Sequence, residues 1–178
     1  MIKILIAVLL LTCSIFVFMQ MRPTGKKLRT DQTKIGILNL EFAYNTYYTT
    51  KVLNAWKPDE KIDAAKTNTY IDFGFLFFYS LFLFYSCKNL SKNFSGSINK
   101  IGKALSITAL IAGGLDVIEN LGMLITLGGN QSSTISMLTA ICASIKWLFA
   151  ILAILYVIFI SPAALYSFLR NKNQQSLK

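Results

Sequence analysis

The sequence contains no histidine among its 178 residues. This absence excludes histidine metal sites, Ser-His-Asp triads and imidazole proton relays. Cysteine is scarce too: the three cysteines, at positions 13, 87 and 142, lie in or beside apolar runs and have no Cys-x-x-Cys spacing. They therefore indicate neither a disulfide framework nor a zinc site, and we interpret them as small buried hydrophobic residues.

Charged residues are also sparse, at 15% of the chain. Acidic residues are the less frequent kind, with eight Asp and Glu against 18 Lys and Arg. Hydrophobic residues make up 54% of the chain, and the mean hydropathy is +0.52. Such a chain is too apolar for an ordinary soluble domain. The basic residues lie between long apolar runs, where they are typical of topology signals and of contacts with anionic lipid head groups. We therefore expect membrane lipids as partners and no nucleic acid.

Four apolar runs are long enough to cross a bilayer as helices. The predicted transmembrane helices are residues 2–19, 70–87, 104–127 and 135–160. The first run could also be a cleaved signal peptide, but it continues past any plausible cleavage point, which favours a retained helix. The sequence thus predicts an all-α, polytopic membrane protein, with four transmembrane helices in an antiparallel bundle and a single membrane domain over residues 1–178.

Residues 20–69 form the longest stretch between two predicted spans. Within them, residues 35–56 show an apolar face opposite a narrow polar stripe, which predicts an amphipathic helix packed on the bundle or lying at the lipid interface. The loops on the side of the two termini hold eight basic residues and no acids. The positive-inside rule then predicts an inner-membrane protein with both termini cytoplasmic and residues 20–69 extracytoplasmic.

The third run carries polar residues that need an explanation, because charge is costly inside a bilayer. Asp116, Glu119 and Asn120 lie at i, i+3 and i+4 and so share one helix face. Lys146 is the only charge in the fourth run. Asp116 is twelve residues before Gly128 and Lys146 thirteen after Ser133, so both lie roughly 18–20 Å from the connecting turn. We therefore predict a structural ion pair between Asp116 and Lys146 near the bilayer midplane.

Other acidic and amide side chains are expected on the outer side of this pair. The predicted binding pocket faces outward and consists of Glu41, Asn45, Asp72, Glu119 and Asn120. A pocket rich in carboxylates could share protons, hold a cation, or receive a cationic substrate or a lipid head group. If the cation is a metal, its ligands would be Glu41, Asp72 and Glu119; no certain cofactor is implied. The alternative is that these groups only pair with one another and fix the register of the helices.

Several short motifs carry a resemblance to a known group. They are Leu40-Glu41-Phe42-Ala43, Trp56, Asp72-Phe73-Gly74-Phe75, Tyr79 and Asp116-Val117-Ile118-Glu119-Asn120. In this combination, over roughly residues 35–125, the chain resembles a group of uncharacterised small bacterial four-helix integral membrane proteins. The resemblance implies that these polar positions belong together, and it brings no activity with it.

Three classes of function remain in view. The first is a non-enzymatic protein that binds a ligand, cation or lipid, or takes part in transport, with a homo-oligomer as one form. The second is an accessory or assembly subunit of a larger membrane complex. The third is an intramembrane lipid-modifying or hydrolytic enzyme. Gly113-Gly114-Leu115-Asp116 is similar to the Gly-x-Gly-Asp of intramembrane aspartyl proteases, but the second glycine is displaced and Asp72 is expected far from Asp116 in depth. We therefore predict no catalytic residue and favour the first class.

Overall fold

The computed structural model describes residues 2–58 and 61–175, with side chains up to Tyr166. Over these residues the backbone forms six helices and no strand. They are α1 (Ile2–Lys27), α2 (Leu38–Glu41), α3 (Thr46–Trp56), α4 (Lys61–Ser91), α5 (Gly96–Leu127) and α6 (Ser133–Gln175). Four of them, α1, α4, α5 and α6, are long and apolar enough to cross a membrane. The all-helical class and the four membrane-length helices are therefore confirmed.

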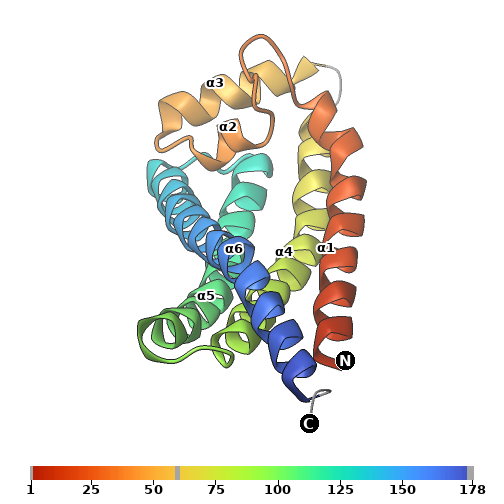
Figure 1. Ribbon diagram of the computed structural model, residues 1–178. Coiled ribbons are helices and arrows are strands. Elements are labelled where there is room, and N and C mark those ends of the chain that lie inside the picture. The colour runs from red at the N-terminus through yellow and green to blue at the C-terminus, as the bar shows by residue number, and fades with distance from the viewer. Residues whose placement is uncertain (1, 59–60, 176–178) are drawn as a thin grey trace.

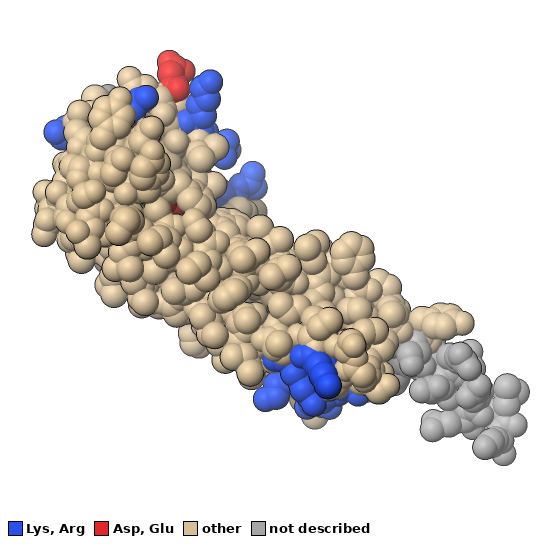
Figure 2. Space-filling model, turned by 90° about the vertical axis from the view of Figure 1, so that its left-hand side faces the viewer, with Lys and Arg blue, Asp and Glu red and all other residues tan. Residues whose placement is uncertain are grey.

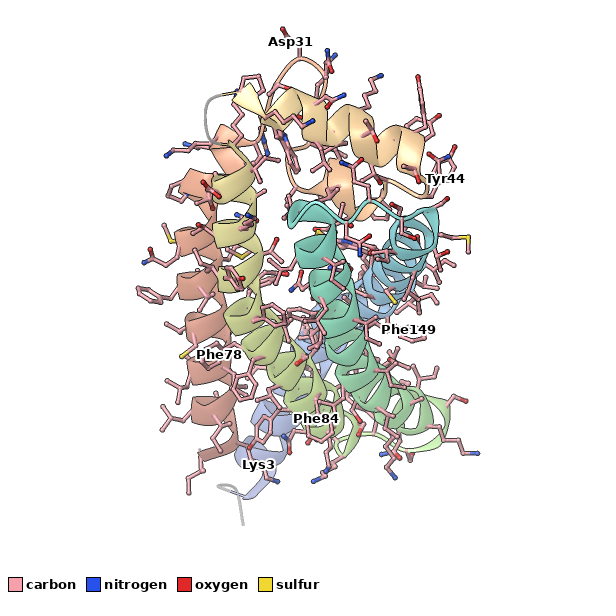
Figure 3. The ribbon with its side chains drawn as sticks, turned by 180° about the vertical axis from the view of Figure 1, so that it is seen from behind. Lys3, Asp31, Tyr44, Phe78, Phe84 and Phe149 are labelled. Carbon is pink, nitrogen blue, oxygen red and sulfur yellow. The ribbon has the colours of Figure 1, made fainter. Side chains whose placement is uncertain are left out.

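The long helices pack around α4, which contacts α1, α5 and α6 (Figure 1). The start of α1 and the end of α6 lie at one end of the molecule, and α2 and α3 lie across the other end, over the ends of α5 and α6. Figure 3 places Lys3 at the first end and Asp31 and Tyr44 at the second. In the space-filling view of Figure 2, Lys and Arg gather near the two ends, with a broad uncharged band between them.

Two of the long helices continue beyond their predicted ends, through a proline in each case. Helix α1 includes Pro23 and ends at Lys27, and α6 includes Pro162. In α1, the side chains of Asn68 and Thr24 both donate to the Met21 carbonyl, at 2.9 Å. In α6, Ser161 Oγ donates to the Val157 carbonyl at 2.6 Å. Each proline removes the hydrogen bond to the carbonyl four residues earlier, but both helices continue through it. The predicted spans ended before these prolines, at residues 19 and 160.

The predicted amphipathic helix over residues 35–56 is wrong as a single element. The structure has two helices there, α2 and α3, separated by residues 42–45. Asn45 is in an extended conformation (φ −153°, ψ 169°), and its side-chain oxygen accepts a hydrogen bond of 3.1 Å from the Tyr48 N–H. An asparagine at this position caps the first turn of a helix, so it begins α3 instead of continuing α2.

We call residues 28–57, which contain α2 and α3, the cap. Its centre is Trp56, which is fully buried and donates its indole N–H to the Leu28 carbonyl (2.9 Å) and to Thr33 Oγ1 (3.1 Å). The same apolar core includes residues from the ends of α4 and α5. Its buried members are Leu28, Leu40, Val52, Leu53, Trp56, Ala65, Met123 and Leu127. The cap is therefore packed onto the long helices and closes one end of them.

Helices α4 and α5 approach closely at Gly113. A Cβ atom added there would lie 2.8 Å from Ser80 Cβ, whereas one added at the neighbouring Gly114 would meet nothing within 4 Å. We expect Gly113→Ala to lower the free energy of unfolding by about 1–3 kcal/mol, because it overpacks this contact. Gly114→Ala should leave stability unchanged or raise it, since alanine is the better helix former. Thermal unfolding of both variants in detergent checks the difference.

A second-site change separates overpacking from other effects of the alanine. Adding Ser80→Gly to Gly113→Ala removes the clashing Cβ and should restore part of the lost stability. Equal stability of the Gly113→Ala and Gly114→Ala variants would contradict the close contact.

Candidate functional site

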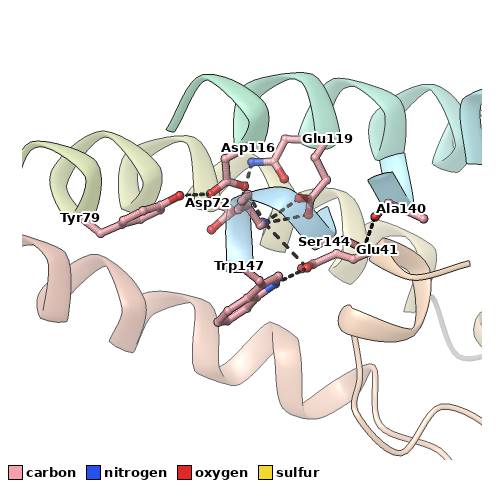
Figure 4. A network of polar contacts seen from close by, with 10 residues as sticks. Glu41, Asp72, Tyr79, Asp116, Glu119, Ala140, Ser144 and Trp147 are labelled. Carbon is pink, nitrogen blue, oxygen red and sulfur yellow. Dashed lines mark hydrogen bonds and ion pairs between the residues drawn. The ribbon is translucent and has the colours of Figure 1, made fainter. Parts of the chain in front are cut away.

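A buried lysine, Lys146, contacts acidic side chains from two other helices. Figure 4 shows how the acids Glu41, Asp116 and Glu119 point toward one another. Lys146 Nζ on α6 lies 2.8 Å from Asp116 Oδ1 and 2.8 Å from each carboxylate oxygen of Glu119, both on α5. Glu41 Oε2, from α2 in the cap, lies 3.7 Å from the same nitrogen. The structure therefore brings Asp116 and Lys146 together, but Lys146 also contacts Glu119 and Glu41.

Three further hydrogen bonds extend this cluster. Tyr79 on α4 donates to Asp116 Oδ2 (2.8 Å), and Asn120 Nδ2 donates to Asp72 Oδ2 (2.8 Å). Trp147 Nε1 donates to Glu41 Oε2 (3.3 Å). We call the joined residues the Lys146 cluster; they are Glu41, Asp72, Tyr79, Asp116, Glu119, Asn120, Lys146 and Trp147. The cluster links α2, α4, α5 and α6, so every element around it supplies a polar group.

Local sequence explains why these side chains meet. On α5 the i, i+3, i+4 spacing of Asp116, Glu119 and Asn120 puts them on one face, one turn beyond the buried Ala112 and Gly113. On α6, the buried Ala143 and Ala150 lie about one turn on either side of Lys146. Small residues let the helix backbones approach, so that the long polar side chains between them reach one another.

The cluster is rich in acid and closed. It contains four carboxyl groups and one ammonium group, and none of Glu41, Asp72, Asp116, Glu119 and Lys146 is more than 8% exposed. Charges of one sign repel strongly where water is excluded, so the acids in excess over Lys146 either hold protons or need a further positive group. Glu41, Asp72, Glu119 and Asn120, which were predicted to line an outward-facing pocket, are all buried, and α2 of the cap brings Glu41 onto the cluster.

One acceptor atom in the cluster lacks a donor. Asn120 Oδ1 is buried and has no hydrogen-bond partner, whereas Glu119 Oε2 lies 2.8 Å from the ammonium nitrogen of Lys146. Both residues are fully buried, with 0% of their surface exposed. An unpaired buried acceptor costs about 1–3 kcal/mol, and Asn120 Oδ1 has a free lone pair for a bound donor.

The metal ligands suggested by the sequence do not form a metal site here. Within residues 2–58 and 61–175, no group of three or more His, Cys, Asp or Glu side chains is arranged to hold a metal ion. The ammonium of Lys146 instead lies between Glu41 and Glu119, at distances typical of N–H donors. Asp72 is linked to Asn120 and not to that ammonium by any hydrogen bond in the described cluster.

One residue predicted in the pocket lies outside the Lys146 cluster, and two members of the cluster were not predicted. Asn45, predicted in the pocket, caps α3 and has its side-chain oxygen on the Tyr48 N–H. Tyr79 and Trp147 were not named as site residues. Tyr79 lies seven residues after Asp72, two turns along the same face of α4, and this spacing could have identified it. Trp147 follows Lys146 directly, and only the position of the cap makes it a partner of Glu41.

Comparison with known proteins finds no family model, no curated protein and no solved structure that matches this chain.

Proposed function

We propose that the four long helices cross the inner membrane as an antiparallel bundle, with both termini cytoplasmic and the cap extracytoplasmic. The eight basic residues around the termini and the α4–α5 turn, with no acids among them, support this orientation. The cap end is basic as well, but its Lys and Arg are mixed with acids such as Asp31 and Asp63.

Labelling of single cysteines tests this orientation. Tyr47 in the cap is 70% exposed and Ile98 at the start of α5 is 39% exposed. In spheroplasts, a membrane-impermeant maleimide should label a Tyr47→Cys variant and leave an Ile98→Cys variant unlabelled until the membrane is opened. The reverse pattern would mean that the protein has the opposite orientation.

We further propose that the Lys146 cluster binds a cation that carries a primary ammonium group, as part of a non-enzymatic binding or transport function. The single observation behind this proposal is the buried acceptor Asn120 Oδ1, which has no hydrogen-bond partner and lies inside a cluster with more carboxyls than ammonium groups. A ligand ammonium would supply both the donor that Asn120 Oδ1 lacks and a positive charge. Its site would lie between Glu119, Asn120 and Asp72, beside Lys146.

The contacts of Lys146 favour an ammonium over a metal ion. Its nitrogen already has carboxylate oxygens at 2.8 Å on two residues, which is the spacing of a charge-assisted N–H···O bond. Calcium and magnesium require six or more oxygen ligands at shorter distances, or several retained waters. The cluster therefore supports recognition of N–H donors more directly than coordination of a metal.

Thermal unfolding of the purified protein in detergent tests the proposal. Methylammonium has three N–H donors, whereas tetramethylammonium has the same charge and none. We expect methylammonium chloride to raise the unfolding temperature, because a ligand at 100 times its Kd stabilises the folded state by about 2.7 kcal/mol. Tetramethylammonium and sodium chloride at equal ionic strength should have little effect.

Variants locate any effect within the protein. Glu119→Gln, which weakens the acceptor, should abolish the difference between methylammonium and tetramethylammonium. Lys103→Met removes an exposed charge elsewhere on α5. This control variant should still be stabilised by methylammonium more than by tetramethylammonium. If methylammonium raises the unfolding temperature equally in the wild type, Glu119→Gln and Lys103→Met, binding at the cluster is contradicted.

A further inference from the structure

Of the four acids in the Lys146 cluster, all of them within the described residues, Asp72 alone makes no ion pair with the lysine. A lysine ammonium has three N–H donors. The nitrogen of this one lies 2.8 Å from Asp116 and Glu119 and 3.7 Å from Glu41. Three carboxylates therefore share its three donors, and none remains for Asp72.

Asp72 reaches the cluster from α4 and is only 8% exposed (Figure 4). Among the described residues, the only hydrogen bond to its side chain comes from a neutral group, the amide of Asn120, whose Nδ2 lies 2.8 Å from Asp72 Oδ2. Burying a carboxylate without a positive partner is far more costly than burying a neutral carboxylic acid. The surroundings of Asp72 therefore favour a side chain that carries a proton.

The charged groups that act on Asp72 point the same way. They are Asp116 on α5, Lys146 on α6 and Glu41 on α2. Two of the three are acids, which repel a further negative charge at this position. On α4 itself, Tyr79 is neutral and donates its hydroxyl to Asp116. Helix α1, which also packs on α4, has no charged residue at positions 4–21.

A protonated Asp72 also accounts for the unpartnered atom of the cluster. Asn120 Oδ1 is fully buried and has no hydrogen-bond partner, and it belongs to the same amide that donates to Asp72. A carboxylic acid and an amide can pair through two hydrogen bonds, in which the amide N–H donates to one carboxyl oxygen and the acid O–H donates to the amide oxygen. An ionised Asp72 has no hydrogen to donate and leaves Asn120 Oδ1 without a donor.

We propose that Asp72 holds a proton in the absence of ligand and donates it to Asn120 Oδ1, and that a ligand ammonium replaces this proton. The exchange rests on the proposed function, because it concerns the same site. On binding, the O–H bond of Asp72 breaks, its electron pair stays on the carboxylate, and the proton is released to the solution. The ammonium then donates N–H bonds to Asp72 and Asn120. One positive charge enters as another leaves, so the charge of the buried cluster does not change.

Infrared spectroscopy of the ligand-free protein tests the proton on Asp72. In a detergent without ester groups at neutral pH, the spectrum of the wild type minus that of Asp72→Asn should contain the C=O stretching band of a protonated carboxylic acid. Asp63→Asn is the matched control, because Asp63 lies on the same helix with its side chain 80% exposed. This control should lose only carboxylate bands. If Asp72→Asn also loses only carboxylate bands, Asp72 is ionised and the proposal is overturned.

Proton release from the wild type tests the exchange without any variant. In weakly buffered detergent solution, a pH indicator should report about one proton released for each methylammonium bound, and by linkage the affinity should rise about tenfold per pH unit until ligand-free Asp72 is ionised. Sodium chloride should release none. Asp72→Asn keeps the size of the side chain and an N–H donor for Asn120, but it has no acidic proton and should release none. Binding of methylammonium to the wild type without proton release would overturn the exchange.

The outcomes separate this inference from the proposed function. If the acid band is present and methylammonium does not bind, the proposed function has failed, whereas the proton on Asp72 stands. If methylammonium binds and neither the acid band nor proton release is seen, the proposed function stands and this inference is wrong.

Discussion

Replacing Lys146 with methionine is expected to destabilise the protein more than any other single change in the cluster. The substitution leaves Asp116, Glu119 and Glu41 buried with no ammonium among them. Removing one partner of a buried ion pair typically lowers the free energy of unfolding by about 3–5 kcal/mol, because an uncompensated charge remains. Thermal or denaturant unfolding in detergent measures the loss.

Removing the opposing acids should reverse much of this loss. The double variant Lys146→Met with Asp116→Leu should be more stable than Lys146→Met alone, and adding Glu119→Gln should recover more, since Glu119 contacts the same nitrogen. Losses that simply add would show that the residues are not coupled. Lys103→Met is the matched control and should change stability by no more than about 0.5 kcal/mol.

Replacing Trp56 with alanine is expected to detach the cap. Trp56 is fully buried, fills the core of the cap and makes both indole hydrogen bonds. Truncating a buried tryptophan typically costs about 3–5 kcal/mol. Trypsin should then cleave the cap at Lys51 faster in the variant than in the wild type, because the α3 backbone becomes accessible to the protease.

Two variants show which part of the tryptophan matters. Trp56→Phe keeps most of the apolar contact and removes the donor to Leu28 and Thr33, so it should lose about 1–3 kcal/mol. Tyr47→Ala changes an aromatic residue of α3 that is 70% exposed and should leave the cleavage rate unchanged. Unaltered trypsin resistance in Trp56→Ala would mean that other contacts hold the cap.

The sequence predicted the four long helices because their apolar runs are long enough to cross a bilayer. It predicted their ends less well. The predicted spans ended at residues 19 and 160, whereas α1 and α6 continue through Pro23 and Pro162. The break between α2 and α3 occurs because Asn45 is extended and caps the first turn of α3, so one helix does not run through this position.

Residue spacing along the predicted helices identified part of the candidate site. Helical geometry grouped Asp116, Glu119 and Asn120, and counting from the connecting turn gave Lys146 the same depth as Asp116. Such counting fixes depth only to about one turn, so it could not show that Lys146 reaches Glu119 as well. The contact of Glu41 with Lys146 required the folded position of the cap, which no local pattern encodes.

Binding of radiolabelled methylammonium to the purified protein in lipid nanodiscs tests the central claim most directly. We predict saturable binding of one ligand per chain, displaced by unlabelled methylammonium but not by tetramethylammonium, and lost in the Glu119→Gln variant. An absence of saturable binding to the wild type, or equal binding to Glu119→Gln, would contradict an ammonium site in the Lys146 cluster.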